Sequence, residues 1–130
     1  MENKIRHLEM IQGVISRMAN NSFLLKGWAV TLVAGIFTLA AKDADKLYFI
    51  IAYIPIVVFW GLDSYYLLQE RLYRSLYEKV SVYDENNIDF SLKATTSEFG
   101  NNKNNYLNCL ISKQNCVFTC LWQLFVRQLL

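Results

Sequence analysis

Few side chains in this sequence could carry out chemistry, and their spacing does not favour an enzyme or a metal centre. His7 is the only histidine, so neither a histidine cluster nor a Ser-His-Asp or Cys-His set can be built around it. Cys109, Cys116 and Cys120 include no C-x-x-C pair and lack a fourth ligand. A net charge of +2 is too small to indicate nucleic-acid binding. We therefore expect no enzyme, no cofactor and no metal.

Two charges stand out because they lie at the edges of long apolar runs. Lys26 lies near the start of the first run and Asp63 near the end of the second. Residues equidistant from a tight connection share one depth, and reflecting position 26 through Ala44 gives 62, next to Asp63. Pairing would lower the cost of placing both charges at a membrane edge, so we expect a structural ion pair. The alternative is that Lys26 extends to lipid headgroups and Asp63 meets water.

The elements that must position these charges are apolar. The chain has 130 residues, of which 54% are hydrophobic and 18% charged, and no charge occurs in 27–41 or 47–62. A bilayer core about 30 Å thick needs roughly 20 apolar residues in a helix, and residues 23–41 and 47–68 meet that length. A cleaved signal would begin earlier and be shorter, and a soluble bundle would show a polar stripe on each helix. The sequence predicts two transmembrane helices in contact with lipid.

Basic residues indicate how these spans are oriented. They precede the core of the first span and follow the second span: Lys4, Arg6, Arg17, Lys26, Arg71, Arg74 and Lys79. The short connection holds two lysines against two aspartates, so it does not outweigh the flanks. The positive-inside rule then places the N-terminus and the segment after the second span in the cytoplasm. We expect a multi-pass protein of the cell membrane with a cytoplasmic N-terminus.

Small side chains form a stripe along the first span. The stripe recurs at steps of four and three residues: Gly27, Thr31, Ala34, Thr38 and Ala41. Small residues let transmembrane helices approach closely, so the stripe packs against the second span or a second copy, or lines a narrow oligomeric pore. In the second span, Pro55 removes a backbone donor and is expected to kink the helix.

The flanks of the spans show helical periodicity. Apolar residues repeat at steps of three and four in both, like the seam of a coiled coil: Leu8, Ile11, Ile15, Met18, Leu72, Leu76 and Val80. We expect residues 1–83 to form an all-α transmembrane hairpin that continues into the cytoplasm as two helices. Residues 20–22 are expected to break the first helix and cap the next. Alternatively, the N-terminal helix lies on the membrane surface.

The remaining chain changes character twice. Residues 84–105 are polar and rich in asparagine, and we interpret them as a linker or loosely ordered loop. Residues 106–130 are apolar again, but their charge-free run, 114–126, is short for a span. The segment is expected to insert partly, to lie at the interface, or to pack on the cytoplasmic helices.

The stretches HLEMIQGVISRMANNSFLLKGWAVTLVA and DSYYLLQERLYRSLY resemble a group of small, largely uncharacterised bacterial inner-membrane proteins. Some of these proteins sit among phage-defence or mobile genes. The resemblance covers residues 7–80 and implies a bacterial membrane protein, with no assigned active residue. Two function classes remain: a homo-oligomeric membrane effector, defensive or toxin-like, and a membrane-anchored scaffold that presents its cytoplasmic helices to a partner protein.

Overall fold

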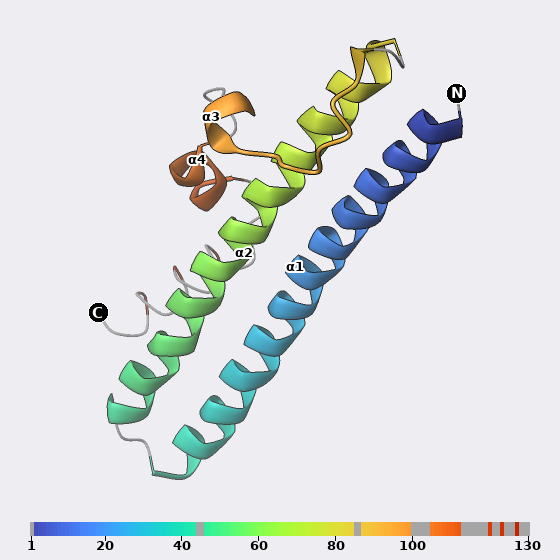
Figure 1. Cartoon of the computed structure of the whole chain (residues 1–130). Coiled ribbons are helices and arrows are strands. Elements are labelled where there is room, and N and C mark those ends of the chain that lie inside the picture. The colour runs from blue at the N-terminus through green and yellow to red at the C-terminus, as the bar shows by residue number, and fades with distance from the viewer. Residues whose placement is uncertain are drawn as a thin grey trace.

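The protein is dominated by two long helices that run antiparallel and side by side (Figure 1). The computed structural model describes residues 2–43, 46–84, 87–99 and 105–112, together with 120, 123 and 127. Within these residues every regular element is a helix: α1 (Glu2–Asp43), α2 (Lys46–Val82), α3 (Thr96–Phe99) and α4 (Tyr106–Leu110). The predicted all-helical class is therefore confirmed for the described part of the chain.

The first long helix is unbroken, which corrects one expectation. α1 contains 42 residues and continues through 20–22, where the sequence predicted a break and a new cap. The reason is that the Ser22 hydroxyl does not turn back to the local backbone. It donates a hydrogen bond to the Asp63 carboxylate on α2 instead, and it is buried between the two helices. The N-terminal residues of α1 therefore continue along α2, which does not agree with a separate helix lying on a surface.

The second long helix is also continuous, although it contains a proline. α2 contains 37 residues with Pro55 inside it. Proline has no backbone N–H, so the carbonyl of Ile51 loses its intrahelical donor at this point. The helix nevertheless extends on both sides of Pro55, and the proline itself is half-buried.

Two apolar clusters hold α1 against α2. Near the connection between the helices, the buried cluster consists of small and β-branched residues: Ala29, Val33, Ala52 and Ile56. Near the termini, the buried cluster is Ile11, Ile15, Leu76 and Val80. Each helix contributes a pair spaced by four residues to each cluster, which is the spacing that keeps side chains on one helix face. A single stripe on each helix thus forms the contact along most of its length.

Residues 87–95, here called the strap, are extended and pack on the helix pair. Ile88 and Ala94 contact the cluster near the termini, as does Phe99 of α3. Figure 1 shows the strap running from the end of α2 along the helix pair to α3. Within the predicted linker 84–105, the strap is therefore attached to the helix pair through Ile88 and Ala94, and through the contact of Phe90 with His7.

The helix α4 attaches to the middle of α2. Its Cys109 is buried against Leu67, Leu68 and Leu72. Two hydrogen bonds join α4 to residues nearer the start of α2. The Trp60 indole Nε1 donates to the Leu110 carbonyl at 3.1 Å, and the Tyr106 hydroxyl donates to the Gly61 carbonyl at 3.0 Å. Most of the predicted apolar segment 106–130 lies outside the described residues.

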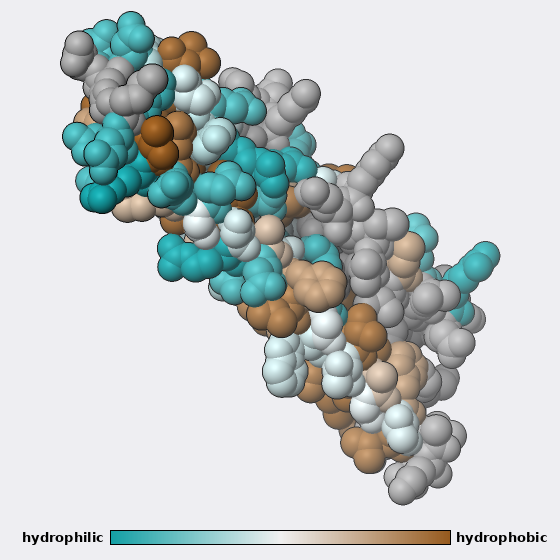
Figure 2. Space-filling view, turned by 90° about the vertical axis from the view of Figure 1, so that its right-hand side faces the viewer, coloured by the Kyte–Doolittle hydropathy of each residue, from teal (hydrophilic) through white to brown (hydrophobic). Residues whose placement is uncertain are grey.

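Both long helices are long and apolar enough, by length and composition, to cross a membrane. In their most apolar 18-residue windows only 17% of α1 and 28% of α2 is buried, which is little for the core of a soluble protein. We call residues 27–41 and 47–62, which carry no charge, the apolar half of the helix pair. We call residues 2–22 and 64–82 the charged half. Figure 2 shows apolar side chains gathered toward one end of the molecule and hydrophilic ones toward the other.

Candidate functional site

A polar group of three side chains, Ser22, Lys26 and Asp63, lies between the helices where the apolar and charged halves meet. Lys26 Nζ lies 3.1 Å from Asp63 Oδ2. The same ammonium donates to Ser22 Oγ at 3.1 Å, and Ser22 Oγ donates to Asp63 Oδ1. The three groups therefore form a closed ring. We call this ring the polar triad.

Helix geometry explains how the triad assembles. Ser22 and Lys26 are four residues apart on α1 and so lie on one face, one turn above the other. Asp63 comes from α2 at the depth that reflection through residue 44 gives for position 26. Its side chain is fully buried, whereas 23% of the Lys26 side chain is exposed. The structure thus brings Lys26 and Asp63 together, and the lysine still reaches the surface.

The triad provides partners for the Asp63 carboxylate, whose burial would otherwise be costly in free energy. A buried carboxylate needs a counter-ion and hydrogen bonds, because its desolvation is not repaid by Coulomb attraction alone. The Lys26 approach to Oδ2 is not aligned as a hydrogen bond, so the ammonium acts there mainly as a charge. Ser22 supplies the hydrogen bond to the other oxygen. This arrangement fixes the register of α1 against α2, because a shift of either helix would separate the groups.

The small-residue stripe lies on the face of α1 that points away from α2. Gly27, Thr31, Ala34 and Thr38 are all exposed, while Ala29 and Val33 make the contact with α2. The side chain of Ala41 lies outside the described residues. The Thr31 and Thr38 hydroxyls each donate to the carbonyl four residues earlier, at 2.9 Å, so both polar groups are satisfied within α1. Packing of this stripe against the second helix is therefore not what the structure shows.

The predicted cytoplasmic seam is formed with one change. Ile11, Ile15, Leu72, Leu76 and Val80 are buried, and Leu8 and Met18 are half-buried. His7, not Leu8, occupies the buried position one turn before Ile11. The His7 ring meets Phe90 of the strap edge-on, at 5.5 Å between centroids, and its Nε2 atom has no hydrogen-bond partner. The end of the seam is thus covered by the strap.

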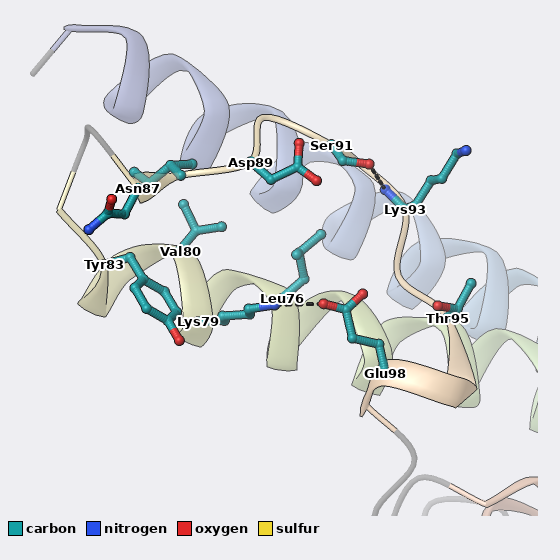
Figure 3. Close-up of a pocket in the computed structure, with 11 residues that line it drawn as sticks. Leu76, Lys79, Val80, Tyr83, Asn87, Asp89, Ser91, Lys93, Thr95 and Glu98 are labelled. Carbon is teal, nitrogen blue, oxygen red and sulfur yellow. Dashed lines mark hydrogen bonds and ion pairs between the residues drawn. The ribbon is translucent and has the colours of Figure 1, made fainter.

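A cleft of about 470 Å³ opens between α2, the strap and α3. Figure 3 shows Lys79 directed toward Glu98 and the Lys93 amine pointing away from that pair. Lys79 Nζ lies 2.6 Å from Glu98 Oε1 and 5.4 Å from the centre of the Phe99 ring. The hydrogen bond to Glu98, with the charges of Glu98, Tyr83 and Asp89, raises the pKa of Lys79 despite some desolvation. The pair ties α3 to the end of α2 across the cleft.

The cysteines divide by environment. Cys109 is buried against α2, and this burial raises the pKa of its thiol, although Arg71 opposes the shift. Arg71 also donates to the Ser112 hydroxyl at 2.8 Å, so one arginine braces the segment after α4. Cys120 is exposed, and Cys116 lies outside the described residues. Among the described residues no three potential metal ligands gather.

The strap and the contact of Ser22 with Asp63 were not predicted from the sequence. Residues 87–95 alternate strictly, with polar side chains at odd positions and Ile88, Phe90, Leu92 and Ala94 at even ones. That period of two is the signal of an extended segment with one apolar face, and it would have indicated the strap. Ser22 was interpreted as a cap. Its position one turn before Lys26 was the available sign that it could join the ion pair.

Comparison with protein-family models, curated proteins and solved structures finds no match to this chain. The class of the protein is therefore defined by its own fold. The described residues form an all-helical chain with two helices that are long and apolar enough to cross a membrane.

Proposed function

We propose that the chain is an integral membrane protein whose α1 and α2 cross the bilayer as a hairpin and continue into the cytoplasm. The bilayer core is about 30 Å thick, and residues 23–43 alone give about 32 Å of helix. Residues 2–22 add a further length of about 32 Å. The triad then lies near the cytoplasmic edge of the core, where the partly exposed Lys26 can reach headgroups. The resemblance noted above would make this membrane the inner membrane of a bacterium.

The proposed orientation has a direct test. Reporter fusions at residues 1, 44 and 90 should give cytoplasmic, periplasmic and cytoplasmic signals, because basic residues flank the pair and not its connection. A periplasmic signal at 90 contradicts the two-span arrangement.

Within the membrane, we propose that copies of the hairpin associate through the small-residue stripe and perturb the membrane. The observation that carries this proposal is the outward direction of the stripe. Gly27, Thr31, Ala34 and Thr38 are exposed, and a Cβ atom added at Gly27 would meet nothing within 4 Å. Small residues with internally bonded hydroxyls let a second helix approach closely in lipid. The proposed activity is that of a membrane effector, defensive or toxin-like.

The effector proposal is tested by inducing the gene in a bacterium and following membrane potential and growth. We expect rapid depolarisation, with oligomers captured by cross-linking in the membrane. Thr31→Leu combined with Ala34→Leu should reduce both, because larger side chains overfill a close helix contact. Leu32→Phe is the matched control, since Leu32 is exposed at the same depth but lies on another side of the helix. Monomers in every variant, with an unchanged potential, would contradict the proposal.

A second candidate function is a membrane-anchored scaffold that presents the charged half to a cytoplasmic partner. The cleft between α2, the strap and α3 favours this candidate, since it adds a concave, polar surface beyond the membrane. A normal membrane potential and normal growth on induction, together with correct insertion, would favour the scaffold over the effector.

A further inference from the structure

We propose that α4 is an interfacial anchor whose outer face, Leu107 and Ile111, lies in the headgroup region of the cytoplasmic leaflet. This inference rests on the proposed membrane insertion of α1 and α2. It adds a third site of lipid contact, outside the two long helices. The partner is the lipid bilayer itself.

The depth of α4 follows from its hydrogen bonds. Trp60 and Gly61, which bond Leu110 and Tyr106, lie on the apolar side of Asp63. Arg71, which bonds Ser112, lies eight residues to the other side of Asp63, or about 12 Å along the helix. The helix α4 is therefore held across the boundary between the apolar and charged halves. In a membrane this boundary is the interface.

The orientation of α4 leaves an apolar face directed outward. The side chains of Tyr106 and Cys109, spaced by three residues, contact α2, and the Leu110 backbone carbonyl accepts the hydrogen bond from Trp60. Leu107 of α4 and Ile111, the residue that follows α4, take no part in these contacts and are 65% and 82% exposed. On α2 the exposed Leu62 and Tyr65 are apolar or aromatic at the same level. The exposed face of α4 is thus continuous in depth with the apolar surface that α2 would present to lipid.

Physical chemistry favours lipid as the occupant of this face. The short helix α4 has exposed apolar residues on one side and Arg71 of α2 beside it. This combination suits the boundary between acyl chains and anionic headgroups. Trp60 and Tyr106 are amphipathic rings, which prefer that depth. Their polar atoms are bonded between α4 and α2, so the position of α4 relative to the interface is fixed by the protein.

The test measures depth by spin labels on the full chain in vesicles of phosphatidylethanolamine and phosphatidylglycerol. Cys116 and Cys120 are replaced by alanine, Cys109 is kept because its side chain is fully buried against α2, and single labels are placed at 107, 111, 54 and 97. Oxygen concentrates among acyl chains and a nickel chelate in water, so their relaxation effects report depth. Ile54 and Ser97 are both exposed, at mid-span and on α3 respectively, and serve as lipid and water references.

We expect labels at 107 and 111 to lie about 5–10 Å into the interface, between the two references. Accessibility at 107 and 111 equal to that at 97, with 54 in lipid, would overturn the anchor and leave the hairpin intact. Shielding from both reagents would overturn lipid contact in favour of contact with another protein surface. A water-like signal at 54 would overturn the membrane proposal itself, and with it the anchor.

Discussion

The two halves of the helix pair use the same kind of contact but differ in what surrounds it. In the apolar half, Ala29, Val33, Ala52 and Ile56 join the helices, and most other described side chains are exposed. In the charged half, the Ile11 and Leu76 cluster is covered by the strap and α3. A soluble protein would need such a cover along its whole length. The difference supports the proposed membrane insertion, in which lipid would cover the apolar half.

The triad lies where the apolar half meets the charged half, and we expect its removal to have the largest effect on stability. Lys26→Leu leaves the fully buried Asp63 with Ser22 alone, and we expect a loss of about 3–5 kcal/mol in the free energy of unfolding. Asp63→Leu should be less harmful, because Lys26 is partly exposed and can reach headgroups or water. The double variant should recover much of the loss. Denaturant titration in mixed micelles measures these differences.

The exposed Arg6 and Glu2 pair is the control, because such pairs contribute little. Coupling between positions 26 and 63 below about 0.5 kcal/mol would mean that the two charges act independently.

How far the sequence predicts this fold depends on how local the signal is. Two long apolar helices were predictable because length and charge-free runs are properties of each segment alone, and they are confirmed. The depth match of Lys26 and Asp63 could be obtained by reflection because a short connection leaves little freedom. The uninterrupted α1 could not be predicted from the sequence. Local propensity at residues 20–22 favours a cap, and the contact of Ser22 with Asp63 overrides it.

The candidate site was harder to predict where it depends on segments far apart in the chain. His7 is buried because Phe90 of the strap closes over it, and neither residue indicates the other in sequence. The attachment of α4 depends on Trp60 and Leu110, fifty residues apart, whose hydrogen bond no periodicity reveals. The outward direction of the small stripe was equally open, because Ala29 and Val33 offer an alternative close-packing face on the same helix.

The second prediction concerns the cover of the charged half. His7→Leu removes a buried ring nitrogen that has no partner and keeps an apolar side chain beneath Phe90. An unsatisfied buried polar group costs about 1–3 kcal/mol, so we expect this variant to be more stable and its strap to resist protease for longer. Phe90→Ala should act in the opposite direction by uncovering position 7. A less stable His7→Leu variant would show that Nε2 has a stabilising role.

The third prediction concerns α4, which bridges the halves. Trp60→Phe keeps a smaller aromatic ring and loses the donor to Leu110, and the lost hydrogen bond costs about 1 kcal/mol. Because burial protects Cys109 and raises the pKa of its thiol, looser docking should increase its alkylation rate. A change of 1 kcal/mol corresponds to a factor of about 5. The rate is measured with Cys116 and Cys120 replaced by alanine.

Trp28→Phe is the matched control for this measurement, because Trp28 is exposed on α1. Equal alkylation rates in both variants would show that the indole hydrogen bond does not hold α4.

The smallest expected effect is the pH dependence of the strap and α3. The pKa of Lys79 is raised above its ordinary value of 10.5, chiefly by the hydrogen bond to Glu98. A raised pKa means that docking favours the protonated amine. The stabilisation is thus fully present below pH 10.5 and is lost as the pH rises through the higher pKa of the folded state. A spin label at 97 should become more mobile over that range. Lys79→Arg stays charged and should abolish the change, while Lys79→Met should show the mobile state already at pH about 8. A transition that persists in Lys79→Arg would assign it to the neighbouring tyrosines instead.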